Sequence, residues 1–299
     1  MKNSIIILLF AFFLFNLTGC NKYDPVDSEE YQKVVIFVST QSLSSLLKST
    51  TVANNDEKFV GELLLFGVDN EKVEQRELIT IGAGDIDDNG IISVELILKR
   101  KIKTLYAVAN PTTDLKNADL LLQPVTALTN MTVSFGVMPG RPFLMSGTGT
   151  VNSYSATIEL FRAVAKVEIE SLDNDLKIIS VTAKNTPNQG YVFERKSLTS
   201  IPGVPINYNN PVSSPNPIYV AENIASNPTN FELVGEYKKQ PVNYTIVLKK
   251  NDDNIPIQRN KHYKVGIKPL TESQGIISLS IPDWEDGGTQ DSIFDPDDF

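Results

Sequence analysis

Short apolar segments separated by turn-forming residues run through most of the chain. In the first half, five of them have the length, the alternation of apolar and polar positions, or the β-branched composition of strands. They span residues 34–40, 59–68, 77–81, 91–98 and 105–109. Asn, Asp, Gly or Pro residues follow several of these segments, as in the turns of β-sandwiches. The pattern therefore predicts an all-β fold.

The second half continues in the same way. Residues 155–169 form a long strand signal that is interrupted around Arg162. Further strands are expected at residues 176–183, 219–221, 230–238, 242–250, 262–268 and 276–281. Residues 201–217 carry five prolines, and because proline has no backbone donor, an extended surface loop is predicted there.

Two segments of the first half fit a loop or a helix better than a strand. Residues 41–55 are rich in Ser, Thr and Leu and are expected to form a loop, with a helical turn at residues 43–47. Residues 114–130 contain three consecutive leucines and are expected to hold one short helix. Neither segment changes the all-β assignment.

The first twenty residues have the pattern of an export signal rather than that of a strand. Lys2 precedes an apolar run at residues 5–15, which is short for a membrane span and has the form of a cleaved secretory signal. The run leads into Leu-Thr-Gly-Cys, ending at Cys20, which resembles the lipobox of bacterial lipoproteins. That resemblance implies a signal peptide at residues 1–19 and a lipid on the thiol of Cys20. The alternative is an ordinary signal peptide followed by a stray cysteine.

Without residues 1–19 the chain keeps 299 − 19 = 280 residues, which suits two domains, each with its own core. We therefore expect a polar tether at residues 20–30, an N-terminal β-sandwich at 31–150 and a C-terminal β-sandwich at 151–299 that ends in an acidic tail. By the bacterial sorting rule, Asn21 rather than aspartate after Cys20 implies the outer membrane.

Charge and cysteine content exclude several classes of function. The net charge is −9, or −10 once Lys2 is removed with the signal, and an acidic chain is repelled by a phosphate backbone, so we expect no nucleic-acid partner. Cys20 is the only cysteine, which excludes an intramolecular disulfide and a thiolate metal cluster. We expect neither a cofactor nor a metal.

Candidate chemistry is sparse. His262 is the only histidine, and at the start of an expected strand it is read as an exposed strand-edge residue rather than a catalytic one. Residues 85–90 begin like a calcium loop, but the closing carboxylate position holds Leu96, and an Asn-Gly turn explains the same letters. Trp284, the only tryptophan, lies among acidic residues and is read as part of a solvated tail. We predict a protein that is not an enzyme.

Five stretches occur in order along the chain. They are Tyr-Ala-Val-Ala-Asn at 106–110, Met-Ser-Gly at 145–147, Leu-Phe-Arg-Ala-Val-Ala-Lys-Val-Glu-Ile at 160–169, Tyr-Val-Ala-Glu-Asn at 219–223 and Arg-Asn-Lys-His-Tyr-Lys-Val at 259–265. Together with the lipobox they resemble the fimbrillin family of lipoprotein pilus subunits from Bacteroidales bacteria. The resemblance implies two tandem transthyretin-like Greek-key β-sandwiches, a surface-exposed fimbrium on the outer membrane, adhesion, and other fimbrial subunits as partners.

The resemblance also implies assembly by strand exchange, in which a protease removes the first strand and a neighbour's C-terminal strand takes its place. On this interpretation the exchanged strand is residues 31–40, with Val34, Ile36 and Val38 on one face. A permanent edge strand that never leaves is the open alternative. The family's protease cuts after arginine, which residues 41–58 lack, so either a lysine-tolerant protease cuts at Lys48 or the subunit keeps its lipid and acts as an anchor.

The donor strand has two candidates. Residues 283–299 form a C-terminal extension, but it is acidic and therefore a poor filler of an apolar groove. Ile277, Leu279 and Ile281 are the better donor set, at the cost of opening their own sandwich. The competing class of function is a non-polymerising surface lipoprotein that binds glycan or peptide; a lipoprotein hydrolase would need paired acids in a cleft.

Overall fold

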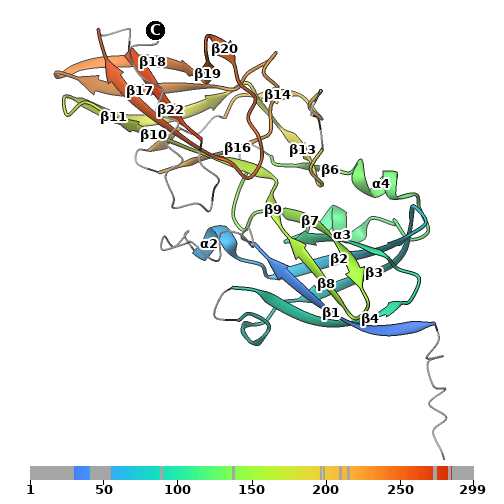
Figure 1. Cartoon of the computed structure of the whole chain (residues 1–299). Coiled ribbons are helices and arrows are strands. Elements are labelled where there is room, and N and C mark those ends of the chain that lie inside the picture. The colour runs from blue at the N-terminus through green and yellow to red at the C-terminus, as the bar shows by residue number, and fades with distance from the viewer. Residues whose placement is uncertain are drawn as a thin grey trace, which may run out of the picture.

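The protein is described here by a computed structural model, which describes residues 30–40, 55–87, 90–136, 139–195, 197, 199–208, 211–213, 216–271, 275–281 and 284. Strands make up most of this part of the chain, and its helices are short. The all-β prediction is therefore confirmed. Figure 1 shows two lobes, with β1 to β5 and β7 to β9 in one and β10, β11, β17, β18 and β22 in the other.

The first lobe is built on one sheet of the order β3-β2-β5-β7-β8-β1-β4, with β9 paired to β7. Its strands are β1 (Tyr31–Ser39), β2 (Glu62–Asp69), β3 (Lys72–Thr80), β4 (Ile92–Lys99), β5 (Thr104–Ala109), β7 (Met145–Asn152), β8 (Ser155–Glu159) and β9 (Phe161–Arg162). Apolar side chains from β1, β4 and β8 pack in one core with those from β2, β5 and β7. The sheet thus encloses its own core as a sandwich, which we call the N-terminal sandwich.

Strand β2 explains why residues 59–68 are apolar without alternation. Leu63 and Leu65 belong to the core just described, whereas Leu64 and Phe66 belong to a second core on the other face. A strand that is buried on both faces needs apolar side chains at consecutive positions.

Two short helices, α3 (Thr113–Asn117) and α4 (Val125–Thr129), contribute Leu115 and Leu128 to this second core. Residues 114–130 therefore hold two short helices instead of the one expected, and the segment between them is not helical. Thr112 caps α3 through a hydrogen bond from the amide of Leu115 to its hydroxyl.

The second lobe contains two four-stranded sheets, of the orders β16-β10-β21-β22 and β15-β11-β17-β18. These strands are β10 (Val164–Ser171), β11 (Leu176–Lys184), β15 (Val212–Ser213), β16 (Ile218–Ala221), β17 (Asn230–Tyr237), β18 (Gln240–Val247), β21 (His262–Pro269) and β22 (Gly275–Ser280). Their inward side chains form a single apolar core, and we call this lobe the C-terminal sandwich. Small strand pairs complete it: β12 (Thr186–Pro187) with β14 (Pro205–Ile206), and β19 (Lys249–Lys250) with β20 (Asp253–Asn254).

Short strands link the two lobes. Strands β8 and β9 continue the first sheet past residue 150, so the boundary expected at that position lies inside the N-terminal sandwich. Strand β6 (Thr132–Ser134), from the first half of the chain, pairs with β13 (Gln189–Tyr191) from the second half. The lobes are therefore joined by strand pairing as well as by chain connection.

Residues 201–217 are only partly the surface loop that their prolines predict. Two of their short segments form the strands β14 and β15, each of which pairs with another strand of the C-terminal sandwich. The side chain of Tyr208 is buried in the C-terminal core. The side chain of Asp87 accepts a hydrogen bond from the amide of Ile91, and the carbonyl of Asp87 accepts one from the amide of Gly90, in line with the turn interpretation. No helix in the described part of the chain is long and apolar enough to cross a membrane.

Candidate functional site

Strand β1 occupies an inner position of the N-terminal sandwich. It pairs antiparallel with β4, from Tyr31 opposite Lys99 to Val38 opposite Ile92, and parallel with β8, from Val35 opposite Ser155 to Ser39 opposite Glu159. Strand β1 is therefore not an edge strand. Removal of β1 would open a gap between two strands rather than expose a new edge.

The side chains of β1 alternate as the sequence predicts. Val34, Ile36 and Val38 are each 0 % exposed and lie in the core between the two layers. Val35 and Phe37 face outward, and Phe37 is exposed. The inward set fills one continuous row of the core, which is the geometry that an exchanged strand requires.

Strand β22, which contains Ile277 and Leu279 and is followed directly by Ile281, is held differently. It is the terminal strand of its sheet and pairs only with β21 among the described strands. Leu279 is buried, Ile277 is half-buried and Ile281 is 38 % exposed. A groove of about 430 Å³, lined by Ile276, Ile277 and Leu279 of β22 and by residues around the end of β18, lies beside this strand.

Other predicted site residues lie outside the described residues. These are Cys20, Lys48 and all of the acidic tail after Trp284. Trp284 itself is described, and its side chain is 5 % exposed. The prediction that it belongs to a solvated segment is therefore wrong, because its indole packs against the junction of the two sandwiches.

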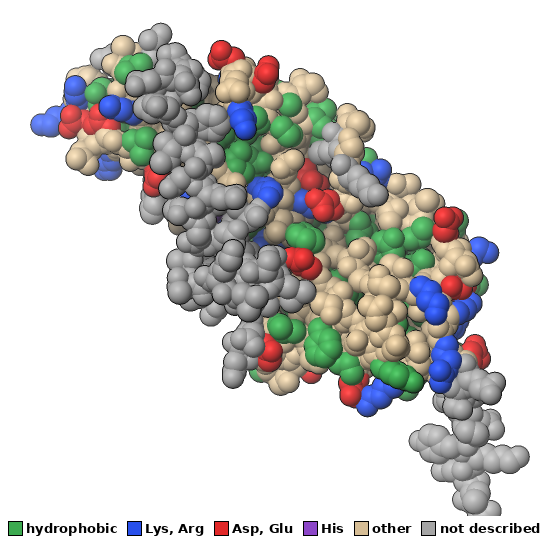
Figure 2. Space-filling model, in the orientation of Figure 1, with side chains coloured by type: hydrophobic (Ala, Val, Ile, Leu, Met, Phe, Trp, Pro, Cys, Tyr) green, Lys and Arg blue, Asp and Glu red, His purple; other side chains and the backbone are tan. Residues whose placement is uncertain are grey.

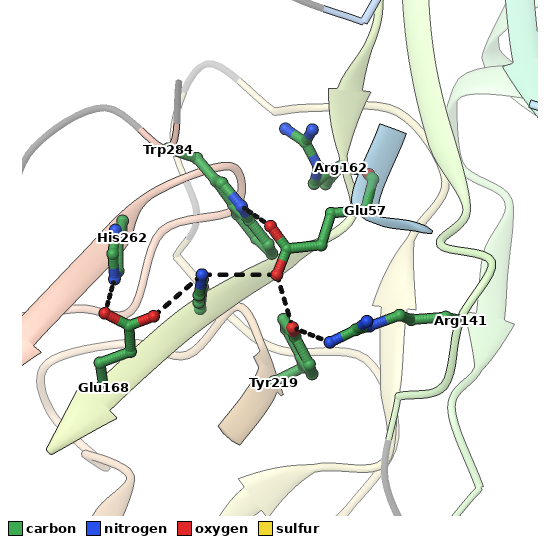
Figure 3. Close-up of polar contacts among 8 residues, drawn as sticks. Glu57, Arg141, Arg162, Glu168, Tyr219, His262 and Trp284 are labelled. Carbon is green, nitrogen blue, oxygen red and sulfur yellow. Dashed lines mark hydrogen bonds and ion pairs between the residues drawn. The ribbon is translucent and has the colours of Figure 1, made fainter. Parts of the chain in front are cut away.

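The junction is organised around Glu57, a side chain that the sequence analysis did not single out. Glu57 lies in α2 (Asn55–Lys58), the element that follows β1 in the described chain, and is buried. Its Oε1 accepts a hydrogen bond of 2.6 Å from the hydroxyl of Tyr219, and its Oε2 accepts one of 3.0 Å from the indole Nε1 of Trp284 (Figure 3). The ammonium of Lys166 lies 3.4 Å from Oε1.

Arg162 is the second buried charge of the junction, with 0 % exposure. Its Nε donates to the backbone carbonyl of Glu57 at 3.0 Å, and its Nη1 donates to the side-chain oxygen of Asn260 at 3.0 Å. The guanidinium carbon lies 4.7 Å from the centre of the Trp284 ring, which is cation–π distance. Arg162 thus connects the N-terminal sandwich, α2 and the C-terminal sandwich.

Three aromatic rings enclose these charges. The rings of Tyr219 and Trp284 stack with 5.8 Å between centroids, and Phe143 packs against both. Arg141 donates a hydrogen bond of 2.7 Å to the hydroxyl of Tyr219. An apolar wall around a buried carboxylate excludes water and strengthens each of its hydrogen bonds.

The electrostatics follow from this packing. Burial raises the pKa of Glu57, but hydrogen bonds from Tyr219 and Trp284 and the charge of Lys166 outweigh burial, and the net direction is downward. Burial, and then the hydrogen bond to Glu57, raise the pKa of the Tyr219 hydroxyl. Glu57 is therefore ionised at neutral pH, and Tyr219 is a neutral donor.

A second set of charges continues from Lys166. Its ammonium also lies 2.9 Å from Glu168, whose other oxygen lies 2.9 Å from Nε2 of His262. The hydrogen bond from His262 lowers the pKa of Glu168 to about 2. His262 starts β21, an inner strand, and is 12 % exposed, so the expectation of an exposed strand-edge histidine is wrong.

Four of the five sequence stretches that carry the fimbrillin resemblance contribute residues to this junction or to its neighbourhood. Three of them supply residues described above, which are Arg162 and Lys166, Tyr219, and Asn260 and His262. From the stretch at 106–110, Asn110 donates to the carbonyls of Phe59 and Phe143. Arg259 donates to Glu222 at 2.8 Å and to the carbonyl of Val192 at 3.0 Å, so the motif residues bind one another across the molecule.

Two sequence signals could have pointed to the junction. Arg162 interrupts an apolar strand, and Trp284 is a large aromatic side chain within an acidic segment. Glu57 gives no such signal, because glutamate in a short polar segment is ordinary. The arrangement as a whole holds segments together, and the described residues contain no group of three or more His, Cys, Asp or Glu side chains that could hold a metal ion.

Solved structures of other proteins superpose on this architecture. The tip fimbrial protein Mfa3 from Porphyromonas gingivalis, with a C-terminal truncation, superposes with a TM-score of 0.58 at 15 % identity, over 85 % of this chain and 100 % of that one. A fimbrilin (FimA) from Porphyromonas gingivalis W83 superposes with a TM-score of 0.59 at 14 % identity, over 85 % of this chain and 97 % of that one. The fold is that of fimbrial proteins.

The resemblance inferred from the sequence motifs is therefore confirmed at the level of the fold. No protein-family profile matches the chain, and no curated protein matches it by sequence. The superposed part is 85 % of the chain, which is more than either sandwich alone contains. Both of these solved proteins are fimbrial proteins.

Proposed function

We propose that this chain is a structural subunit of an outer-membrane fimbria, in which β1 is replaced by a strand of a neighbouring subunit, and that the fimbria supports adhesion. The observation that supports this most directly is the inner position of β1 between β4 and β8. A replacement strand in that position pairs on both edges and fills the core row vacated by Val34, Ile36 and Val38.

The energy available to an incoming strand is large. Burial of three aliphatic side chains contributes roughly 4.5–9 kcal/mol before ordering costs, at 1.5–3 kcal/mol for each side chain. Backbone hydrogen bonds to β4 and β8 add to this, because amides and carbonyls left in an apolar gap would otherwise lack partners. Such an association can hold a polymer without covalent links.

The donor proposed is β22. Ile277, Leu279 and Ile281 have the same two-residue spacing as Val34, Ile36 and Val38, so they can present three apolar side chains on one face. Because β22 is an edge strand beside a groove, its release breaks only one line of strand pairing. The exchange then replaces a one-sided pairing with a two-sided one.

The lipid and the processing step complete the proposal. Cys20 carries the lipid that brings the precursor to the outer membrane, and a cut at Lys48 separates β1 from α2. The N-terminus and mass of material from the cell surface test this. A start at Ser49 supports a polymerising subunit, an intact lipidated Cys20 supports an anchor subunit, and soluble periplasmic monomers alone would contradict both.

Lys48→Ala sharpens the processing test, with Lys58→Ala as the matched control in the same segment. We expect Lys48→Ala to retain β1 and to prevent polymer growth, whereas Lys58→Ala polymers should resemble the wild type. The proposal assigns no catalytic role to any residue, and its partners are other fimbrial subunits and membrane lipid.

A second candidate function is capture of a glycan or peptide without polymerisation. A cavity of about 660 Å³ on the N-terminal sandwich favours it. Its lining includes Tyr31, Glu77, Lys116 and Asp119, a mixture of an aromatic ring with donors and acceptors that suits a polar ligand. Binding of a glycan array by the wild type, lost in Glu77→Ala, would support this function, and a monomeric surface form would separate it from assembly.

A further inference from the structure

We propose that Glu57 and Trp284 form a latch that holds the carboxyl end of β22 at the junction, and that β22 is donated only after Trp284 leaves Glu57. This inference rests on the proposed function, because it concerns the strand that the function requires as a donor. It assigns a positioning role to two residues that lie outside both exchanged strands.

The contacts of Trp284 are those of a fixed anchor. Its indole N–H donates to the buried carboxylate of Glu57 at 3.0 Å, and its ring stacks on Tyr219 and lies against the guanidinium of Arg162 (Figure 3). A charge-assisted hydrogen bond in a water-excluded site is stronger than a neutral one at the surface. Trp284 is therefore held on several sides at once.

By contrast, β22 has few other restraints. It pairs on one edge with β21, it lines a groove of about 430 Å³, and Ile281 at its end is 38 % exposed. Trp284 follows Ile281 by three residues, so its anchorage limits how far the end of β22 can move. A weakly packed strand with a firmly held end needs that end released before it can leave.

Glu57 keeps other partners when Trp284 departs. Tyr219 on β16 and Lys166 on β10 still bind its carboxylate, and both belong to the C-terminal sandwich. The latch can thus open by movement of Trp284 alone, without exposing an uncompensated buried charge. Because α2 is the described element that follows β1, the same carboxylate lies close in the chain to the strand that the proposal removes.

Three substitutions test the latch in the full-length, unprocessed chain. Trp284→Phe keeps an aromatic ring for stacking but removes the N–H that donates to Glu57. Glu57→Gln keeps the shape of the side chain but removes the charge. Tyr219→Phe is the matched control, because it removes a different donor from the same carboxylate and keeps both the ring and the Trp284 hydrogen bond.

Hydrogen exchange of the β22 amides decides the outcome. We expect these amides to exchange roughly tenfold faster or more in Trp284→Phe and Glu57→Gln than in the wild type or in Tyr219→Phe. The amides of β1 serve as the internal reference and should keep their wild-type rates, which excludes general unfolding. In Glu57→Gln, red-shifted fluorescence of Trp284, the only tryptophan, would report its release independently.

Two results would overturn the inference. One is unchanged exchange of the β22 amides in both latch variants. The other is faster exchange in the unprocessed monomer but no faster growth of surface polymer when the same variants are expressed with processing, since the latch would then not control donation. Failure of the proposed function is measured separately. If a chain whose β1 is covalently locked in place, and which keeps the wild-type latch, still polymerises, the proposed function fails.

Discussion

Strands β1 and β22 illustrate two ways of holding a strand in the same fold. Strand β1 pairs on both edges and contributes three side chains that are each 0 % exposed, whereas β22 pairs on one edge and leaves Ile281 38 % exposed. One strand is bound by the core of its sandwich. The other is bound by a single neighbour and by an anchor at its end.

In the proposed function, this difference gives strand exchange a direction. A strand that leaves an inner position creates a deep apolar gap with two unpaired edges, so it leaves a strong binding site behind. A strand that leaves an edge position loses pairing on one side only, so its release costs less free energy. Exchange between subunits is favourable when the donor gains the two-sided position.

The face shown in Figure 2 adds little to the comparison of β1 with β22. On the face in Figure 2, positive and negative side chains are interspersed and do not form a patch of one sign. Apolar side chains on the same face are scattered among them. This face therefore offers no charged patch that the assembly proposal could use.

The largest expected effect comes from locking β1 in place. Val35 donates its amide to Tyr154 next to β8, so Val35 and Phe37 present their backbone groups to β8, and Phe37 opposite Ser93 is a pair without mutual hydrogen bonds. Such pairs are close enough for a disulfide. The thiol of Cys20 carries the lipid in the proposed function and is not free to pair, so Cys20 is left unchanged. Phe37→Cys with Ser93→Cys should abolish polymer formation, and reduction should restore it.

The two single-cysteine variants are the controls for the lock, and both should polymerise like their parent. Electron microscopy and gel filtration of the processed protein measure the result. Polymers of normal length from the oxidised double variant would show that β1 does not leave, and β1 and β22 would then differ only in stability.

A smaller effect is expected from truncating equivalent side chains of the two strands. Ile36→Ala removes a fully buried side chain and should lower the free energy of unfolding by about 2–5 kcal/mol. Ile277→Ala removes a half-buried one beside a groove and should lower it by about 1–2 kcal/mol. Urea unfolding of both variants measures the difference, and equal losses would contradict the comparison.

The sequence predicts the faces of β1 but not its neighbours. The alternation of Val34, Ile36 and Val38 with Val35 and Phe37 gives the buried side correctly, because the pleat alone sets it. The parallel pairing with β8 joins segments that are far apart in the chain, and periodicity contains no signal for such a partner. The inner position of β1 therefore appears only in the structure.

The junction was less predictable than either strand. The hydrogen bond between Trp284 and Glu57 spans 227 residues, and the one between Tyr219 and Glu57 spans 162. Composition suggested a solvated tail around Trp284, because acidic neighbours dominate that segment. Burial of one aromatic ring against distant partners is a tertiary effect that local composition does not encode.

Acid should weaken the sheet that holds β22. The His262 hydrogen bond keeps the pKa of Glu168 at about 2, below its usual 4.5, so the stability that Glu168 contributes is complete above about pH 4.5 and is lost as the pH falls toward 2. Lys166 and His262 are the basic groups that face it. We expect Trp284 fluorescence to shift in this range before circular dichroism reports unfolding.

Glu168→Gln tests the cause, with Glu170→Gln on the same strand as the control. The stability difference between the wild type and Glu168→Gln should shrink as the pH falls from about 4.5 toward 2, whereas the Glu170→Gln variant should follow the wild type. An acid response that is unchanged in Glu168→Gln would assign the effect to other carboxylates.

The smallest expected effect concerns the outer face of β1. Lys33 and Glu95 form an ion pair at 2.6 Å between β1 and β4, but their side chains are 65 % and 59 % exposed. Exposed pairs contribute about 0–1 kcal/mol because water and salt screen them, so Lys33→Ala should change the unfolding free energy by less than Ile36→Ala. If Lys33→Ala released β1 as readily as Ile36→Ala, measured by hydrogen exchange of the β1 amides, the strand would be held by its surface charges. The core row would then not distinguish it from β22.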